Sequence, residues 1–113
     1  MTYGYLATMR TKAGHRDDVV QILLSGLDGL RQVGCRLYVV GVSETDPELI
    51  WVNEVWESKE HHDASLRLPE TRAAIAAAMP LLTGEFTSQE TLIAGGGAAA
   101  TITSGSLSTG SRR

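Results

Sequence analysis

Three side chains in the middle of the chain can take up a proton or stabilise a charge: Glu54, His62 and Arg72. His62 is the first candidate for a general base, because the ordinary pKa of an imidazole lies nearest to neutrality. Glu54 could accept a proton if burial raises its pKa, or it could orient His62. Arg72 could stabilise an oxygen anion that develops during a reaction. Each also has a structural interpretation, as a half-buried helix histidine, a strand carboxylate and a solvated helix arginine.

Trp56 adds a large flat surface to these groups. It follows Glu54 by two residues, so in a strand the two side chains share one face of the sheet. Its ring could stack on an aromatic ligand, and its indole N–H could bind an oxygen atom of that ligand. The alternative is an ordinary core tryptophan.

Several other kinds of chemistry are excluded. The sequence has no glycine-rich phosphate loop, no Ser/His/Asp set and no metal-ligand spacing. Three glycines at 95–97 follow the last predicted strand with no helix after them, which excludes a dinucleotide site. Cys35 is the only cysteine, so it cannot form an internal disulfide, and we interpret it as a small apolar residue. We interpret His15 as a surface residue.

The composition is that of one soluble domain. The 113 residues are 42% hydrophobic and 20% charged, with a net charge of -3. Arg112 and Arg113 lie in an acid-free tail, so eight basic and thirteen acidic residues leave the body at -5. The basic residues are scattered among acids, which excludes a nucleic-acid partner. No stretch approaches the roughly 18 apolar residues of a membrane span, so we expect a cytoplasmic protein with no membrane partner.

The order of predicted elements indicates the fold. Strands are expected over residues 3–11, 35–43, 49–57 and 85–93, where β-branched and aromatic residues gather. One amphipathic helix is expected over residues 16–32, ended by Gly34. A second helical region begins after the cap Ser58, is interrupted at Pro69, and ends near Pro80 and Gly84. The order β-α-β-β-α-β predicts an α+β, ferredoxin-like fold with a four-stranded antiparallel sheet and helices on one face.

Both faces of that sheet carry apolar side chains. Trp51 and Val55 point away from Val52 and Trp56 along one strand. A sheet with one wet face should alternate cleanly between apolar and polar residues, so the face without helices is expected to meet a second copy of the chain in a homodimer. We divide the chain into a domain over residues 1–94 and a flexible tail over residues 95–113, which has too few large apolar residues to pack.

Several strings of this sequence together resemble one known family. They are Val33-Gly34-Cys35-Arg36-Leu37-Tyr38, Asn53-Glu54-Val55-Trp56-Glu57-Ser58-Lys59-Glu60, Pro69 and Pro80-Leu81-Leu82-Thr83-Gly84. The chain is similar over residues 3–94 to the antibiotic biosynthesis monooxygenase family, which includes quinol monooxygenases and anthrone oxygenases. Some positions depart from the family pattern, among them Val33, Ser65 and Glu70, where relatives carry proline or histidine.

The resemblance implies a dimeric α+β barrel with an apolar pocket between the sheet and the helices of each subunit. It implies catalysis without metal, flavin or haem, on a small aromatic substrate with molecular oxygen. Trp56 would line the pocket, Glu54 would point toward it, and His62 takes the position of a tyrosine of quinone-forming relatives. Val52 occupies the pocket-facing position where some relatives have asparagine.

The resulting hypothesis is a cofactor-independent monooxygenase that oxidises a quinol or an anthrone-like compound. Haem degradation ranks low, because relatives that perform it use an asparagine in the first strand and residues 3–11 contain none. A non-catalytic ligand-binding or stress-related dimer, or an isomerase of a small metabolite, stays open as the alternative.

Overall fold

The computed structural model describes residues 2–97. The greater part of the predicted tail therefore lies outside the described residues. The described elements are the strands β1 (Tyr3–Thr11), β2 (Cys35–Val42), β3 (Leu49–Trp56) and β4 (Leu82–Leu92), the helices α1 (Arg16–Leu24), α2 (Leu27–Gln32), α3 (Lys59–Ser65) and α4 (Pro69–Ala78), and the 3₁₀ turn η1 (Met79–Leu81). None of the helices in residues 2–97 is long and apolar enough to cross a membrane.

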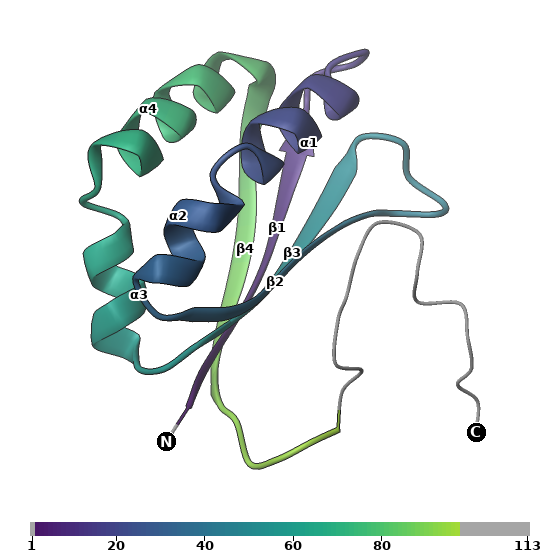
Figure 1. Ribbon diagram of the computed structural model, residues 1–113. Coiled ribbons are helices and arrows are strands. Elements are labelled where there is room, and N and C mark those ends of the chain that lie inside the picture. Colours follow the sequence, from purple (N-terminus) through teal and green to yellow (C-terminus); the bar gives the residue numbers. More distant parts are fainter. Residues whose placement is uncertain (1, 98–113) are drawn as a thin grey trace.

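The strands form one antiparallel sheet in the order β2-β3-β1-β4. The four helices lie on one side of this sheet, and no helix of residues 2–97 covers its other side (Figure 1). The ferredoxin-like α+β prediction is therefore confirmed. The two central strands are β1 and β3, and β3 is the strand richest in aromatic and β-branched residues.

The hydrophobic core lies between the sheet and the helices. One buried cluster joins Val19 of α1, Ile50 and Val52 of β3, Ala78 of α4 and Leu82 of β4. Together these residues fix α1 and α4 against the sheet. A second buried cluster, at the other end of the sheet, consists of Tyr3, Cys35 and Trp56.

The prediction of one helix over residues 16–32 is wrong. Helix α1 ends at Leu24, and the Ser25 hydroxyl donates a hydrogen bond to the Ile22 carbonyl at 2.7 Å. A serine that bonds to a nearby carbonyl competes with the helical ladder, and the Gly26 that follows has low helix propensity. Helix α2 then starts afresh at Leu27.

The last strand also begins earlier than predicted, at Leu82 instead of residue 85. The pairing of β1 with β4 is irregular between Met9 and Thr11, where several β4 residues face one residue of β1. Gly84 lies in this bulge with φ +95°, a conformation that glycine adopts without strain. Gly84 thus bends a strand, whereas the sequence suggested that it ends a helix.

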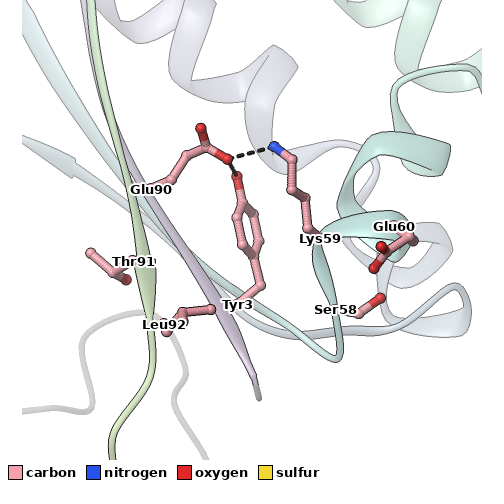
Figure 2. A pocket seen from close by; sticks show the side chains of 7 residues that line it. All are labelled: Tyr3, Ser58, Lys59, Glu60, Glu90, Thr91 and Leu92. Carbon is pink, nitrogen blue, oxygen red and sulfur yellow. Dashed lines mark hydrogen bonds and ion pairs between the residues drawn. The ribbon is translucent and has the colours of Figure 1, made fainter.

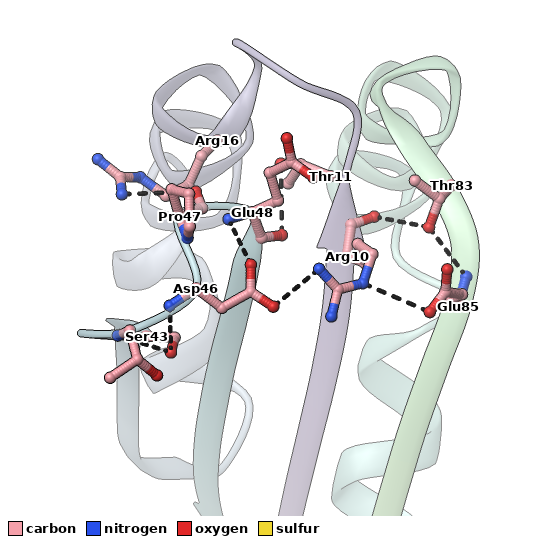
Figure 3. A network of polar contacts seen from close by, with 10 residues as sticks. Arg10, Thr11, Arg16, Ser43, Asp46, Pro47, Glu48, Thr83 and Glu85 are labelled. Carbon is pink, nitrogen blue, oxygen red and sulfur yellow. Dashed lines mark hydrogen bonds and ion pairs between the residues drawn. The ribbon is translucent and has the colours of Figure 1, made fainter.

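Charged side chains fasten this end of the sheet (Figure 3). Arg10 of β1 forms ion pairs with Asp46 in the β2–β3 turn at 2.9 Å and with Glu85 of β4 at 3.4 Å. The guanidinium of Arg10 lowers the pKa of Asp46 by hydrogen bonding. Through Arg10, the network links the β2–β3 turn and β4 to β1. The β2–β3 hairpin therefore keeps its register over the core.

Candidate functional site

A cavity of about 660 Å³ lies between the sheet and the helices. This size is within the range of small-molecule sites. Four large apolar side chains line it although each is roughly half exposed, so they mark its mouth: Leu66, Ile75, Met79 and Phe86. The inner wall is formed by β1 and β3, where Tyr5, Val52, Glu54 and Trp56 face inward.

Trp56 forms part of the inner wall and is only 1% exposed. The indole N–H donates a hydrogen bond to Glu54 Oε1 at 2.8 Å. Strand alternation places the two side chains on one face, as their spacing indicated. The N–H is therefore occupied by Glu54, and it is the face of the ring that is left to contact a ligand.

Glu54 is a half-buried carboxylate that lines the cavity. Burial raises the pKa of this carboxyl, while the hydrogen bond from Trp56 and the nearby His62 act in the opposite direction. Because the pKa is raised, Glu54 is a better proton acceptor than an exposed glutamate. Its hydrogen bond goes to Trp56, so the suggested role of Glu54 as the group that orients His62 is not what the geometry provides.

His62 is 6% exposed and lines the same cavity from α3. Its Nδ1 lies 3.0 Å from Oδ1 of Asp63, and this hydrogen bond lowers the pKa of the Asp63 carboxyl. An ionised carboxylate can only accept hydrogen bonds, so Nδ1 carries the proton. The neutral ring then has its free electron pair on Nε2, which has no hydrogen-bond partner among the described residues. Asp63 thus takes the orienting role, which the sequence offered as one of two roles for Glu54.

Aromatic rings hold the imidazole from three sides. The ring centroid of His62 lies 4.7 Å from that of Tyr5, 5.3 Å from that of Tyr3 and 5.6 Å from that of Trp56. Tyr38 of β2 pairs with Glu54 across the sheet and also lines the cavity. Burial and the neighbouring Glu54 raise the pKa of Tyr38, so its phenol stays neutral and can donate a hydrogen bond.

Sequence reasoning missed these tyrosines. Tyr3 and Tyr5 alternate along β1 on the face that also carries Trp56, which was the available signal. Tyr38 could be placed beside Glu54 only from the register of the hairpin. The structure thus adds phenol groups to the predicted set of acid and base residues.

The other two predicted site residues, Val52 and Arg72, differ in whether they line the cavity. Val52 is 2% exposed and lines the cavity, where it offers an apolar contact. Arg72 is exposed on α4 and is not part of the cavity lining. The geometry therefore brings together Val52, Glu54, Trp56 and His62, and it leaves Arg72 outside.

Tyr3 connects the site to a smaller surface hollow (Figure 2). Its hydroxyl donates to Glu90 Oε1 at 2.9 Å, and Lys59 Nζ lies 2.5 Å from the same oxygen. Burial, with the hydrogen bond to Glu90, raises the pKa of Tyr3, so this phenol also stays protonated. The three groups satisfy one another, and they hold the Tyr3 ring against His62.

Helix α3 is positioned by its first residues. The Ser58 hydroxyl accepts a hydrogen bond from the His61 backbone N–H at 3.1 Å, so the predicted N-cap is confirmed. Gly34, with φ +107°, passes so close to α3 that a Cβ there would lie 2.8 Å from Cδ2 of His61. Its carbonyl accepts a hydrogen bond from the Glu57 N–H at 3.0 Å. This close approach sets the start of α3 and so the depth at which His62 enters the cavity.

Comparison with known proteins gives one family and several solved structures. The family described as antibiotic biosynthesis monooxygenase matches residues 2–77. A crystal structure from Chloroflexus aurantiacus J-10-fl, provisionally named an antibiotic biosynthesis monooxygenase, is 40% identical to this chain. The alignment covers 87% of this chain and 98% of that one, with a TM-score of 0.78. No curated protein matched.

Two more distant structures have the same fold. One, from Caulobacter crescentus CB15, carries the same provisional name and is 20% identical, covering 80% of this chain and 87% of its own length with a TM-score of 0.73. The other is Rv0793 from Mycobacterium tuberculosis, which is 18% identical, covering 87% of this chain and 100% of its own with a TM-score of 0.74. At these identities the likeness supports the fold alone.

Proposed function

Because this chain belongs to the antibiotic biosynthesis monooxygenase family, we propose that it is a cofactor-independent monooxygenase. Its substrate would be a hydroxylated aromatic of the quinol or anthrone type, and its oxidant molecular oxygen. The observation that carries the proposal is that Glu54 and His62, two proton acceptors, line one cavity walled by aromatic rings. Such a cavity can take up a flat ring and remove a proton from it.

Proton removal is the step that the protein must supply. Loss of a proton from a phenol or an activated CH₂ group makes the ring electron-rich enough to react with oxygen. For an anthrone-like substrate, the CH₂ group becomes a carbonyl with one oxygen atom of O₂, and the other atom leaves as water with the two hydrogens. The substrate provides all four electrons, so no further reductant is needed.

His62 is the base in this proposal. Asp63 holds the proton on Nδ1, which leaves Nε2 as the basic atom, and it would stabilise the imidazolium that forms. Tyr3, Tyr5 and Trp56 hold the ring in place. A base that is positioned in this way contributes about 10² to 10⁴ in rate.

Trp56 and Val52 provide the apolar wall for the substrate ring, and Glu54 is the second acid–base group. A substrate hydroxyl placed beside Glu54 would also come near the hydroxyl of Tyr38, its cross-strand neighbour. A neutral phenol can donate a hydrogen bond to the oxygen anion that forms. This is the stabilising role that the sequence suggested for Arg72.

We also propose that the chain forms a homodimer through the uncovered face of the sheet. That face carries the side chains that alternate with the cavity-facing ones, namely Leu6, Leu37, Val39, Trp51 and Val55. Leu6 is 38% and Trp51 is 46% exposed in the single chain. Exposed apolar side chains gathered on one face are typical of a protein–protein interface.

The function is tested by oxygen uptake with an anthrone and with a hydroquinone, without added metal, flavin or nicotinamide. The variant is His62→Phe, which keeps an aromatic ring beside Tyr5 and Trp56. Its control is His61→Phe, the same change at the preceding residue, which is exposed and outside the cavity lining. We expect His62→Phe to lower turnover by about 10²-fold or more and His61→Phe to leave it near that of the wild type.

Equal rates in both variants, with an active wild type, would show that another group is the base. A wild type that oxidises none of these compounds would favour the ligand-binding or isomerase alternative.

A further inference from the structure

The cavity is lined by negative side chains and by no Lys or Arg among the described residues. Its acids are Asp28 of α2, Glu54 of β3 and Glu70 of α4. His62 could become a cation, but the Asp63 carboxylate lies 3.0 Å from its Nδ1 and would balance that charge. The remaining ionisable groups of the lining, Tyr5 and Tyr38, are phenols.

The three acids lie at different depths. Glu54 is half-buried on the inner wall, whereas Asp28 and Glu70 are exposed, which places them where the cavity meets solvent. Asp28 has a cation nearby, Arg31, whose Nη2 lies 3.3 Å from its Oδ1. Glu70 forms no ion pair within the described residues, so no neighbouring cation offsets its charge at the mouth.

A ligand that carries a carboxylate would therefore lose its hydration in this cavity and gain no positive partner. A buried charge without a partner is strongly disfavoured. A neutral ligand loses much less hydration free energy on entering the cavity. A cationic substituent near the mouth would be attracted by Glu70.

We infer that the cavity selects hydroxylated aromatics that are neutral or carry a cationic substituent, and that it rejects those with a carboxylate or a phosphate. The inference rests on the proposed function only in that the ligand is taken to be a hydroxylated aromatic. The charge of the lining then acts as the determinant of specificity.

The test is binding by calorimetry under anaerobic conditions, which separates it from turnover. Three probes share one dihydroxynaphthalene core and differ in a substituent on the far ring: a methyl ester, the free carboxylic acid, and an amide that ends in an amine. At pH 8 we expect the ester and the amine to bind at least about 10-fold more tightly than the acid.

Charge-reversal variants identify the cause. Glu70→Lys should improve binding of the acid by about 3- to 10-fold and leave the ester unchanged. Its control is Glu44→Lys, which changes the net charge equally but is exposed in the β2–β3 turn, outside the lining. Glu44→Lys should leave all three affinities as they are.

The inference is overturned if the acid binds the wild type as tightly as the ester, or if Glu44→Lys has the same effect as Glu70→Lys. It is overturned together with the proposed function if no probe binds. If the ester binds well, the acid poorly, and nothing is oxidised in air, the inference stands and the proposed function fails.

Discussion

Trp56→Phe removes one hydrogen bond from a half-buried carboxylate and part of a buried ring. Trp56 is 1% exposed and its N–H donates to Glu54 Oε1 at 2.8 Å, whereas a phenylalanine keeps a ring but has no donor. The smaller ring costs about 1 kcal/mol of unfolding free energy through lost packing. The lost hydrogen bond to an ionised group costs about 2 kcal/mol more. We therefore expect a loss of about 3 kcal/mol near pH 8.

The loss should depend on pH, with a sign that follows from Glu54. Burial already raises the pKa of Glu54 in the folded state, and the hydrogen bond from Trp56 limits that rise. Because the folded-state pKa of Glu54 is raised, the unfolded chain releases this proton at a lower pH than the folded chain does. The free energy of unfolding therefore falls as pH rises from the unfolded-state pKa to the folded-state pKa. Trp56→Phe widens that interval. Its cost should then be about half as large near pH 4 as near pH 8.

Urea denaturation followed by far-ultraviolet circular dichroism measures the loss of unfolding free energy and its dependence on pH, without relying on tryptophan emission. The control is Glu54→Gln, which keeps an oxygen acceptor for the indole N–H but cannot ionise. In a double-mutant cycle with Trp56→Phe we expect a coupling of about 1 to 2 kcal/mol at pH 8. A coupling below about 0.5 kcal/mol, or a cost independent of pH, would refute the reasoning.

Three further predictions concern the interface, a turn and the base. Trp51→Lys should convert a dimer to monomers in sedimentation at micromolar concentration, and a wild type that is itself monomeric would contradict the proposed interface. Gly34→Ala should lower the unfolding free energy in urea by about 1 to 3 kcal/mol, because φ is +107° and the new Cβ would meet His61. Gly29→Ala, in α2 with open space around it, should instead stabilise by up to about 1 kcal/mol, and equal effects would exclude the strain argument. Asp63→Ala should lower turnover of an anthrone by about 10-fold or more with the affinity for the substrate kept, while Asp18→Ala, which removes the partner of the exposed His15, should change neither.

The strands and their faces could be predicted from the sequence, because alternation is a local property. Glu54 and Trp56 are two residues apart in a strand, and this spacing alone places them on one face. The helices were harder. The break at Ser25 and Gly26 depends on a hydrogen bond from the Ser25 hydroxyl to the Ile22 carbonyl. A hydrophobic pattern carries no information about this hydrogen bond.

The partners within the site could not be predicted, because they depend on how separate elements approach one another. The chemistry of its side chain identifies His62, yet the ring that lies nearest to it is that of Tyr5, 57 positions earlier in the chain. The sequence suggests Arg72 for its charge and its place near the start of α4, but the rotation of that helix leaves it in solvent. A sequence pattern gives the face of a helix, and the facing sheet decides which residues of that face reach the cavity.

The same contacts therefore serve the core and the chemistry. Trp56 belongs to the buried cluster with Tyr3 and Cys35, and it also holds Glu54 at the cavity wall. Tyr3 belongs to that cluster as well, and its ring restrains His62. Since the base and the second carboxylate are held by core residues, substitutions that loosen this cluster should reduce turnover before they unfold the protein. Substitutions in the other cluster, which contains Val19 and Ile50, should lower stability with a smaller effect on turnover. Cys35→Ala and Val19→Ala represent the two clusters, and their turnover is compared at equal loss of unfolding free energy. This comparison separates positioning of the site from general stability. Equal turnover in the two variants would show that the cluster of Tyr3, Cys35 and Trp56 serves the fold alone.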